Sequence, residues 1–228
     1  MKISGLMKLT LLDFPGHVAC TVFLAGCNFR CPFCHNGSLV RGGDLDISKD
    51  ELFAFLKKRR GVLDGVCITG GEPLMNAEVG GLIREIKALG YLIKLDTNGS
   101  YPERLGELLE EGVIDYVAMD IKSGASGYAS ACGVSVDVEK IQKSIELIKS
   151  SGVEHEFRTT VVKGLHTEED IVGCAKLIGA DEPYFLQSYK ESDDIIDPNG
   201  LSSFNSDELA RILAAAQSLN PQTQLRGV

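Results

Sequence analysis

Strand-like and helix-like segments alternate along almost the whole of this 228-residue chain. Six apolar runs, rich in β-branched and aromatic residues, are each followed by a segment with helical spacing or helix-capping residues. The six runs span residues 18–25, 65–69, 91–95, 115–121, 153–162 and 183–189. This alternation predicts an α/β fold with a parallel sheet. Because a closed barrel needs eight strand–helix units, six units predict a partial, open (βα)6 barrel with a lateral mouth.

Local signals mark where the helices begin and end. Ser48 and Glu51 have the spacing of a capping box, which opens a helix through about residue 59. Thr167 precedes three acidic residues, which the helix dipole favours in a first turn. Other helices are expected over residues 78–89, 102–111, 138–149 and 206–219. Residues 191–204 are acidic and rich in turn formers, and we expect a surface loop there.

Composition restricts the class of protein. Hydrophobic residues make up 44% and charged residues 24% of the chain, and the length suits a single globular domain over residues 1–228. No apolar run is long enough to predict a membrane span, and the N-terminus lacks the pattern of a secretion signal. A net charge of −9 disfavours a nucleic-acid backbone as the partner. We therefore expect a cytoplasmic protein without a membrane or nucleic-acid partner.

Three of the seven cysteines lie in one short segment. Cys27, Cys31 and Cys34 have the spacing C-x3-C-x2-C directly after the first apolar run. An ordinary [4Fe–4S] cluster takes four cysteine ligands. Three ligands would leave one iron open to a substrate or cofactor, so the spacing indicates a cluster that takes part in chemistry.

The same segment also fits a zinc site of three cysteines and His35. His35 directly follows Cys34, so its ring would struggle to close a tetrahedron with that cysteine, and the chain has no second C-x2-C pair. A disulfide is disfavoured because three is an odd number. On the cysteines alone, the cluster and the zinc site both remain open.

The other four cysteines are scattered singly, at Cys20, Cys67, Cys132 and Cys174. Cys20 and Cys67 lie in apolar stretches and are expected to be small core residues. None of the four has the spacing to found a second cluster. A thiol-preserving cytoplasm is the natural setting for such a chain.

Polar motifs follow the predicted strands at the edge where a parallel α/β fold carries its site. Gly70-Gly71-Glu72-Pro73 follows the second strand and Asp96-Thr97-Asn98-Gly99 ends the third. The glycines allow a ligand to approach the backbone closely, and the Glu72 carboxylate could accept from an ammonium group. Tight turns with solvated side chains would explain both segments as well.

Charged residues also stand on the fourth and fifth strands. Asp120 and Lys122 are two residues apart, so they share one face. Arg158 lies within the fifth strand, as a clamp for a carboxylate or as a member of an ion pair. A salt-bridged strand end is the alternative for Asp120 and Lys122.

Together these motifs resemble the radical S-adenosylmethionine (SAM) superfamily. The resemblance rests on the cysteine spacing, on the aromatic Phe33 before the last cysteine, and on Gly-Gly-Glu at a strand end, and it covers nearly the whole chain. Segments 12–16 and 26–36 are similar to the glycyl-radical-enzyme activating proteins of that superfamily. Segments 165–171 and 184–187 are most similar to the anaerobic ribonucleoside-triphosphate reductase activating proteins.

The resemblance implies a [4Fe–4S] cluster held by Cys27, Cys31 and Cys34, whose fourth iron binds the amino and carboxylate groups of SAM. An electron from the reduced cluster would break the S–C5′ bond and give methionine and a 5′-deoxyadenosyl radical. That radical would take a hydrogen atom from a glycine of a partner glycyl radical enzyme, expected to be an anaerobic ribonucleotide reductase. A reduced flavodoxin or ferredoxin is the electron donor that the family uses.

The resemblance also implies which residues bind the cofactors. In it, the Gly70–Glu72 segment matches the site of the SAM amino group, and the turn from Asp96 to Asn98 lies near the ribose and methionine. Lys122 and Arg158 match contacts to the methionine carboxylate. The full implied set is Phe33, Gly70, Gly71, Glu72, Asp96, Thr97, Asn98, Asp120, Lys122 and Arg158.

The pyruvate formate-lyase activating enzymes offer two further expectations. Their positions that match Asp96, Thr97 and Asp120 also bind a monovalent cation. Asp13 matches the segment that meets the partner's glycine loop, where their motif reads Asp-Gly-Pro-Gly; Phe14 departs from it. The chain also lacks their SAM-contacting histidine near residues 186–189 and the ferredoxin-like insertion of many activases. A single cluster is therefore expected. The missing histidine disfavours identity with a pyruvate formate-lyase activating enzyme.

Two other interpretations use the same residues. One keeps the cluster and changes the substrate, as in 7-carboxy-7-deazaguanine synthase or an activase of another glycyl radical enzyme. The other is a non-enzymatic zinc or iron–sulfur binding module. Binding of SAM separates the enzymes from the module.

Overall fold

The strands form one eight-stranded sheet whose spatial order follows the chain. In this computed structural model, which describes residues 1–43 and 45–227, β2 to β8 run parallel and β1 pairs antiparallel with β2. The strands are β1 Ile3–Thr10, β2 Ala19–Leu24, β3 Gly65–Gly70, β4 Leu92–Thr97, β5 Tyr116–Asp120, β6 Glu154–Val161, β7 Tyr184–Ser188 and β8 Thr223–Arg226. The six predicted strands correspond to β2 through β7, so the predicted parallel α/β fold is confirmed.

The two edge strands, β1 and β8, were not expected from the sequence. Most of β1 between Gly5 and Leu9 is partly or fully exposed, and β8 has only four residues. Edge strands are often short and carry polar or charged side chains, which prevents pairing with other chains, so they give a weaker sequence pattern than central strands. Since β1 and β8 stand at opposite ends of the described sheet, the sheet is open, as the partial barrel predicts.

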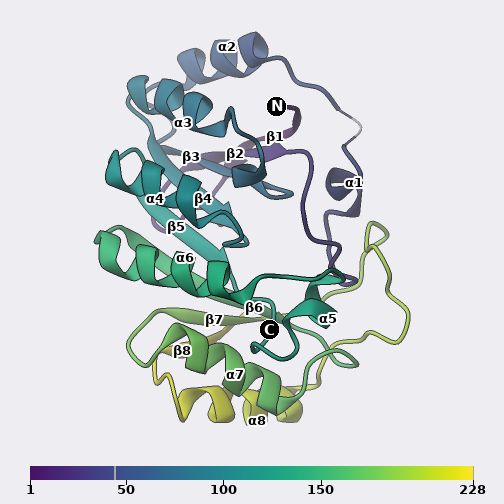
Figure 1. Cartoon of the computed structure of the whole chain (residues 1–228). Coiled ribbons are helices and arrows are strands. Elements are labelled where there is room, and N and C mark those ends of the chain that lie inside the picture. Colours follow the sequence, from purple (N-terminus) through teal and green to yellow (C-terminus); the bar gives the residue numbers. More distant parts are fainter. Residues whose placement is uncertain (44, 228) are drawn as a thin grey trace.

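The helices that connect the parallel strands follow one another down one side of the molecule (Figure 1). They are α2 Lys49–Arg59, α3 Val79–Ala88, α4 Pro102–Glu110, α6 Val138–Ser151, α7 Glu168–Ile178 and α8 Ser206–Gln217. Each of these was predicted, and the capping boxes of Ser48 with Glu51 and of Thr167 with Asp170 are both present. Short helices α1 Gly37–Val40 and α5 Tyr128–Cys132 and the 3₁₀ turn η1 Pro73–Met75 were not predicted.

The hydrophobic core lies between these helices and the sheet. In α3, Leu82, Ile83 and Ile86 are buried, as the helical spacing predicts, and Ile93 and Leu95 of β4 are buried with them. Burial of each such side chain stabilises the fold by about 1.5–3 kcal/mol. Cys20 and Cys67 are also fully buried, which confirms their prediction as core residues.

The opposite face of the sheet carries charged side chains. On β4, Lys94 and Asp96 alternate with Ile93 and Leu95, so they point away from the helices. Lys94 and Glu156 are almost completely buried on this inner face. Buried charges require partners, and these two residues belong to the ion network of the site described below.

The loop over residues 191–204 covers part of the site. Its Asp194 carbonyl accepts from the Gly37 amide at 3.0 Å, its Asp197 amide donates to the Pro32 carbonyl at 2.9 Å, and Ile195 is buried. The predicted loop is therefore present, but its middle packs against the segment that carries the three cysteines. No helix in the described part of the chain is long and apolar enough to cross a membrane.

Candidate functional site

A cavity of about 270 Å³ lies at the carboxyl ends of the parallel strands. The segment after β2 brings Cys27, Cys31 and Cys34 to its wall, and all three thiols are free. The Cys34 amide donates to the Cys31 carbonyl at 3.1 Å, which closes a tight turn between those cysteines. Phe33, between them, is buried and lines the same cavity.

The three thiols differ in their electrostatic surroundings. Burial raises the pKa of Cys27 to about 11, and burial also raises the pKa of Cys34. The Cys132 thiol donates a hydrogen bond to Cys31 and thereby lowers the pKa of Cys31 to about 7. A cationic metal group would favour the thiolate form at all three positions, because metal binding releases the thiol protons.

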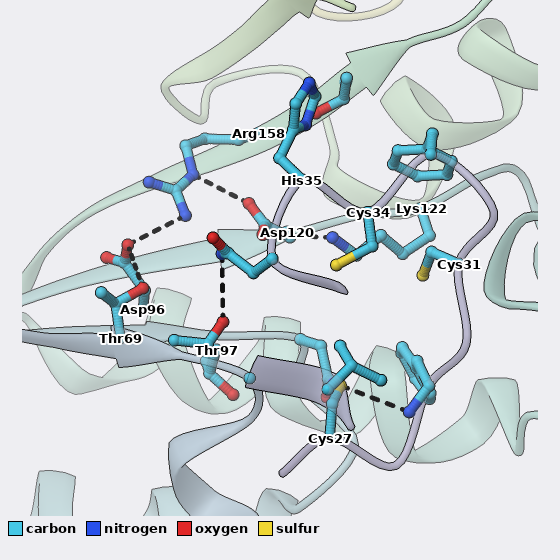
Figure 2. Close-up of a pocket in the computed structure, with 18 of the residues that line it drawn as sticks. Cys27, Cys31, Cys34, His35, Thr69, Asp96, Thr97, Asp120, Lys122 and Arg158 are labelled. Atoms are coloured by element: carbon cyan, nitrogen blue, oxygen red, sulfur yellow. Dashed lines mark hydrogen bonds and ion pairs between the residues drawn. The ribbon is translucent and has the colours of Figure 1, made fainter. Parts of the chain in front are cut away.

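His35 is exposed and lines the same cavity, but its ring points away from the three thiols. Its Nε2 is hydrogen-bonded to the Lys190 carbonyl, and the ring packs beside Tyr189 with centroids 5.7 Å apart. Figure 2 shows this orientation above the cysteines. Among residues 1–43 and 45–227, no three His, Cys, Asp or Glu side chains are grouped to hold a metal ion. Because the His35 ring points away from the three thiols, a Cys3His zinc site does not match this arrangement.

The donor set fits a [4Fe–4S] cluster better than a single ion. A single zinc ion needs four ligands within about 2.3 Å of one point, whereas a four-iron cluster spreads its thiolate ligands over separate irons. Three free thiols from one loop, facing one cavity with polar groups opposite, suit such a cluster with one iron left for another ligand. The buried Phe29 and Phe33 beside them limit access of water.

The backbone after β3 touches the cysteine segment. The Gly71 amide donates to the Leu24 carbonyl at 2.9 Å and the Glu72 amide donates to the Gly26 carbonyl at 2.8 Å. A Cβ atom on Gly71 would lie 2.0 Å from the Gly26 oxygen, so only glycine allows this approach. Gly70 and Gly71 both line the cavity with backbone atoms.

Glu72 itself is completely buried and does not line the cavity. Its carboxylate accepts from the Leu74 amide at 2.9 Å, from the Thr97 hydroxyl at 2.9 Å and from the Asn98 amide at 2.6 Å. Burial raises the pKa of Glu72 to about 7. The side chain thus joins the turn after β3 to the end of β4. This placement differs from the expected carboxylate contact with an ammonium group.

The end of β4 connects with the cysteine segment through Asn98. Its side-chain amide donates to the Asn28 side chain at 3.0 Å and lies 4.0 Å from the Cys27 sulfur. Asn28 in turn donates to the Ser100 hydroxyl at 2.9 Å. Asp96, Thr97 and Asn98 all line the cavity, so the structure brings together the residues that the sequence singled out.

An ion network forms the wall opposite the thiols (Figure 2). Arg158 of β6 contacts Asp120 of β5 at 2.9 Å and Asp96 of β4 at 3.3 Å, and Lys122 contacts Asp120 at 3.2 Å. Burial alone would raise the pKa of Asp120, but Arg158 and Lys122 hold it well below its usual range. Burial would lower the pKa of Lys122, but Asp120 and the nearby cysteines raise it. Both groups are therefore charged at neutral pH.

Sequence reasoning missed Cys132, which ends the unexpected helix α5. Cys132 is fully buried beside Cys31, and its carbonyl accepts from the Arg30 amide at 2.8 Å. One hundred residues separate Cys132 from Cys31 along the chain. Its spacing therefore gave no signal for this contact.

Asp13, like Glu72, is a predicted residue that does not line the cavity. It lies in the turn between β1 and β2, before β2 begins, whereas the cavity lies where β2 ends. Its carboxylate accepts from the Thr21 hydroxyl. A contact between Asp13 and a partner stays a prediction.

The comparisons with known proteins agree with this geometry. Residues 21–178 match the model of the family described as the radical SAM superfamily. The chain belongs to the radical SAM superfamily. Enzymes of this superfamily use a [4Fe–4S] cluster and SAM, so the chain is a radical SAM enzyme and these are its cofactors.

Two relatives and one solved structure show which kinds of radical SAM enzyme this chain is similar to. A provisionally named glycyl-radical enzyme activating enzyme of Methanocaldococcus jannaschii is 34% identical over 84% of this chain and 81% of its own length. A 7-carboxy-7-deazaguanine synthase of Methanospirillum hungatei is 30% identical over 68% of this chain and 63% of its own length. The solved structure of Streptococcus suis SuiB bound to SAM covers 91% of this chain and 52% of its own, with a TM-score of 0.67 at 15% identity. Because the identity to SuiB is low, this structural similarity supports the fold alone.

Proposed function

We propose that this radical SAM enzyme activates a glycyl radical enzyme, and that its partner is an anaerobic ribonucleotide reductase. The observation that carries the proposal is the cavity in which three free thiols of one loop face polar strand ends. The relative from Methanocaldococcus jannaschii, similar over most of both chains, favours glycyl radical activation. The partner itself is inferred from segments 165–171 and 184–187.

In this proposal Cys27, Cys31 and Cys34 hold the cluster. When bound, the cluster and SAM supply a reductive cleavage that yields methionine and a 5′-deoxyadenosyl radical. The chain's residues orient the cofactors and limit water: Phe33, which stands between Cys31 and Cys34 in the sequence, is 4% exposed, and its ring centroid lies 5.9 Å from the Lys122 ammonium. Excluding water matters because a reactive radical would otherwise be lost in side reactions.

The strand ends would hold SAM. The Gly70 and Gly71 backbone is positioned for the amino group, and Glu72 fixes the neighbouring end of β4 by its three hydrogen bonds. The Lys122 ammonium reaches the cavity wall between Asp120 and the Phe33 ring, and its side chain is only 17% exposed. A partly desolvated ammonium binds a carboxylate more strongly than an exposed one, so Lys122 would take the methionine carboxylate.

The partner would present its glycine through the open side of the sheet. There a C–H bond at the glycine Cα would break, and the hydrogen would pass to the 5′ carbon. Asp13 would contact the glycine loop from the β1–β2 turn, next to Leu11 and Leu12, which are 68% and 89% exposed. A reduced flavodoxin or ferredoxin in the same thiol-preserving cytoplasm would supply the electron.

The experiment is to incubate the reconstituted, reduced protein with SAM and an anaerobic ribonucleotide reductase, and to record the EPR spectrum. A glycyl radical doublet on the reductase, with one 5′-deoxyadenosine per radical, would support the proposal. The matched control is Cys31→Ala, which should give neither. Cleavage of SAM without any glycyl radical would rule out this partner while leaving the radical SAM assignment intact.

A second candidate is supported by the 30% identity to a 7-carboxy-7-deazaguanine synthase. That similarity covers less of both chains than the similarity to the activating enzyme. Mass spectrometry of reactions supplied with small-molecule extracts separates the two functions. SAM-dependent formation of 7-carboxy-7-deazaguanine would favour the synthase and count against glycyl radical activation.

A further inference from the structure

Two aspartates on neighbouring strands share one guanidinium. Arg158 Nε donates to Asp120 Oδ1 at 2.9 Å, and Arg158 Nη2 lies 3.3 Å from Asp96 Oδ2. Figure 2 shows the guanidinium between the two carboxylates at the cavity wall. The Arg158 side chain is only 14% exposed. The planar fork of arginine suits such a bridging position.

The remaining oxygens of both aspartates also have donors. Asp96 Oδ1 accepts from the Lys94 ammonium, and Asp96 Oδ2 accepts from the Thr69 hydroxyl at 3.1 Å. Asp120 Oδ2 accepts from Lys122 at 3.2 Å. Each of the four carboxylate oxygens therefore already contacts a cationic or hydroxyl donor.

Thr97 is the third residue of the expected cation site, and its hydroxyl already has hydrogen-bond partners within the protein. Its hydroxyl donates to Glu72 at 2.9 Å and accepts from the Gly99 amide at 3.1 Å. The cation-binding set expected from the pyruvate formate-lyase activating enzymes is thus occupied by the protein's own groups. The residues present do not fit an additional monovalent cation.

The balance of charge leads to the same conclusion. The network contains the carboxylates of Asp96, Asp120 and Glu156, and it contains four cationic side chains. Those four are Lys94, Lys122, Arg158 and Arg226. With three negative and four positive charges, the network already has one surplus positive charge. An added cation would increase that surplus in a poorly solvated site, whereas an anionic group would neutralise it.

We propose that Asp96, Thr97 and Asp120 do not take the monovalent cation that the matching residues bind in pyruvate formate-lyase activating enzymes, because Arg158 already bridges the two aspartates as a fixed guanidinium. Arg158 is then a positioning residue, which holds Asp96 and Asp120 so that Lys122 can face the SAM carboxylate. The cavity binds SAM without sodium or potassium. This inference rests on the proposed SAM site.

The test is the affinity for SAM in different salts at one ionic strength. Calorimetric titration of the reconstituted protein would compare sodium, potassium and tetramethylammonium chloride. The wild-type affinity should agree within about twofold among the three. A loss of tenfold or more in tetramethylammonium would overturn the proposal.

Variants test the role of the guanidinium itself. Arg158→Gln should weaken SAM binding about tenfold in tetramethylammonium, and sodium or potassium should restore part of that loss. Arg158→Lys should keep the affinity independent of the cation, and it decides the question if Arg158→Gln does not fold. The matched control is Arg226→Gln, which removes a cation that pairs with Glu156 but with neither aspartate.

The outcomes separate this inference from the proposed function. An Arg158→Gln protein that binds SAM equally weakly in all three salts would contradict the assigned role. A wild-type protein that binds no SAM in any salt would refute the SAM site, and this inference with it.

Discussion

The two sides of the cavity differ in how their charges are matched. On one side, Cys27, Cys31 and Cys34 are free thiols, and burial raises the pKa of Cys27 and Cys34. On the other side, Asp120 and Arg158 already neutralise each other, and the Arg158 guanidinium also reaches Asp96. We refer to these as the cysteine side and the ion-pair side.

The difference shows which groups each side requires from outside. The cysteine side requires a metal group from outside. Its thiols become good ligands only when they lose their protons, and binding of a cationic metal group causes that loss. The ion-pair side is complete without any added cation and is fixed before a ligand arrives. Preorganised polar groups of this kind bind a charged ligand without having to rearrange.

The largest effect is expected on the cysteine side. Cys31→Ala removes one of three thiolate ligands, and we expect it to abolish cluster binding. Iron and sulfide analysis after anaerobic reconstitution measures this. Cys20→Ala is the matched control, because Cys20 is equally buried but lies at the far end of β2. A Cys31→Ala protein with full iron content and SAM cleavage would show that the cluster is assigned to the wrong residues.

A smaller effect is expected within the ion network behind the cavity. Glu156 is 2% exposed and pairs with Arg226 at 2.8 Å and Arg158 at 3.8 Å. Because Arg226 is 39% exposed and Arg158 keeps Asp120 and Asp96 as partners, Glu156→Ala should lower the free energy of unfolding by about 1.5–3 kcal/mol, the range for hydrogen bonds to charged groups. Urea denaturation measures the change. Cluster content should stay at the wild-type level, and its loss would mean that the two sides are not independent.

Glu72 connects the two sides, so its removal should act on SAM more than on the cluster. Glu72→Ala frees the Thr97 hydroxyl and the Leu74 and Asn98 amides, which loosens the end of β4. We expect SAM affinity to fall about tenfold, or about 1.4 kcal/mol, with the cluster retained. Calorimetry and iron analysis on the same sample measure both. Unchanged SAM affinity would exclude this positioning role.

The last effect concerns pH. The pKa of Glu72 is raised from its ordinary value of 4.5 to about 7 by burial. Between those pH values the folded state holds a proton that the unfolded state has released, so the free energy of unfolding falls as pH rises toward 7. The decrease should be about 1.4 kcal/mol for each pH unit crossed in that range. It is measured as the difference between wild type and Glu72→Gln across pH 5 to 8; a difference that does not vary with pH would contradict the shift.

Much of the site could be predicted because its position depends on local patterns. The carboxyl ends of parallel strands share one edge, so motifs after successive strands must meet, as Gly71, Asn98 and Asp120 do at the cavity. The cysteine segment follows β2 for the same reason. Its three thiols therefore reach the same cavity wall without any long-range signal in the sequence.

The features that escaped prediction depend on contacts between distant side chains. The Glu72 carboxylate accepts hydrogen bonds from three donors in the interior. The Arg158 guanidinium pairs with two carboxylates that belong to two other strands. Cys132 meets Cys31 only because α5 packs against the cysteine segment. Strand spacing indicates that such residues share an edge, but it does not determine which partner each side chain selects.

The most direct test is the reductive cleavage of SAM under anaerobic conditions. The protein is reconstituted with iron and sulfide and reduced with dithionite, SAM is added, and 5′-deoxyadenosine is assayed while the EPR spectrum is recorded. The structure and the family predict 5′-deoxyadenosine together with a [4Fe–4S]⁺ signal that changes when SAM binds. A protein that takes up zinc, forms no cluster and leaves SAM intact would contradict this account and indicate a metal-binding module.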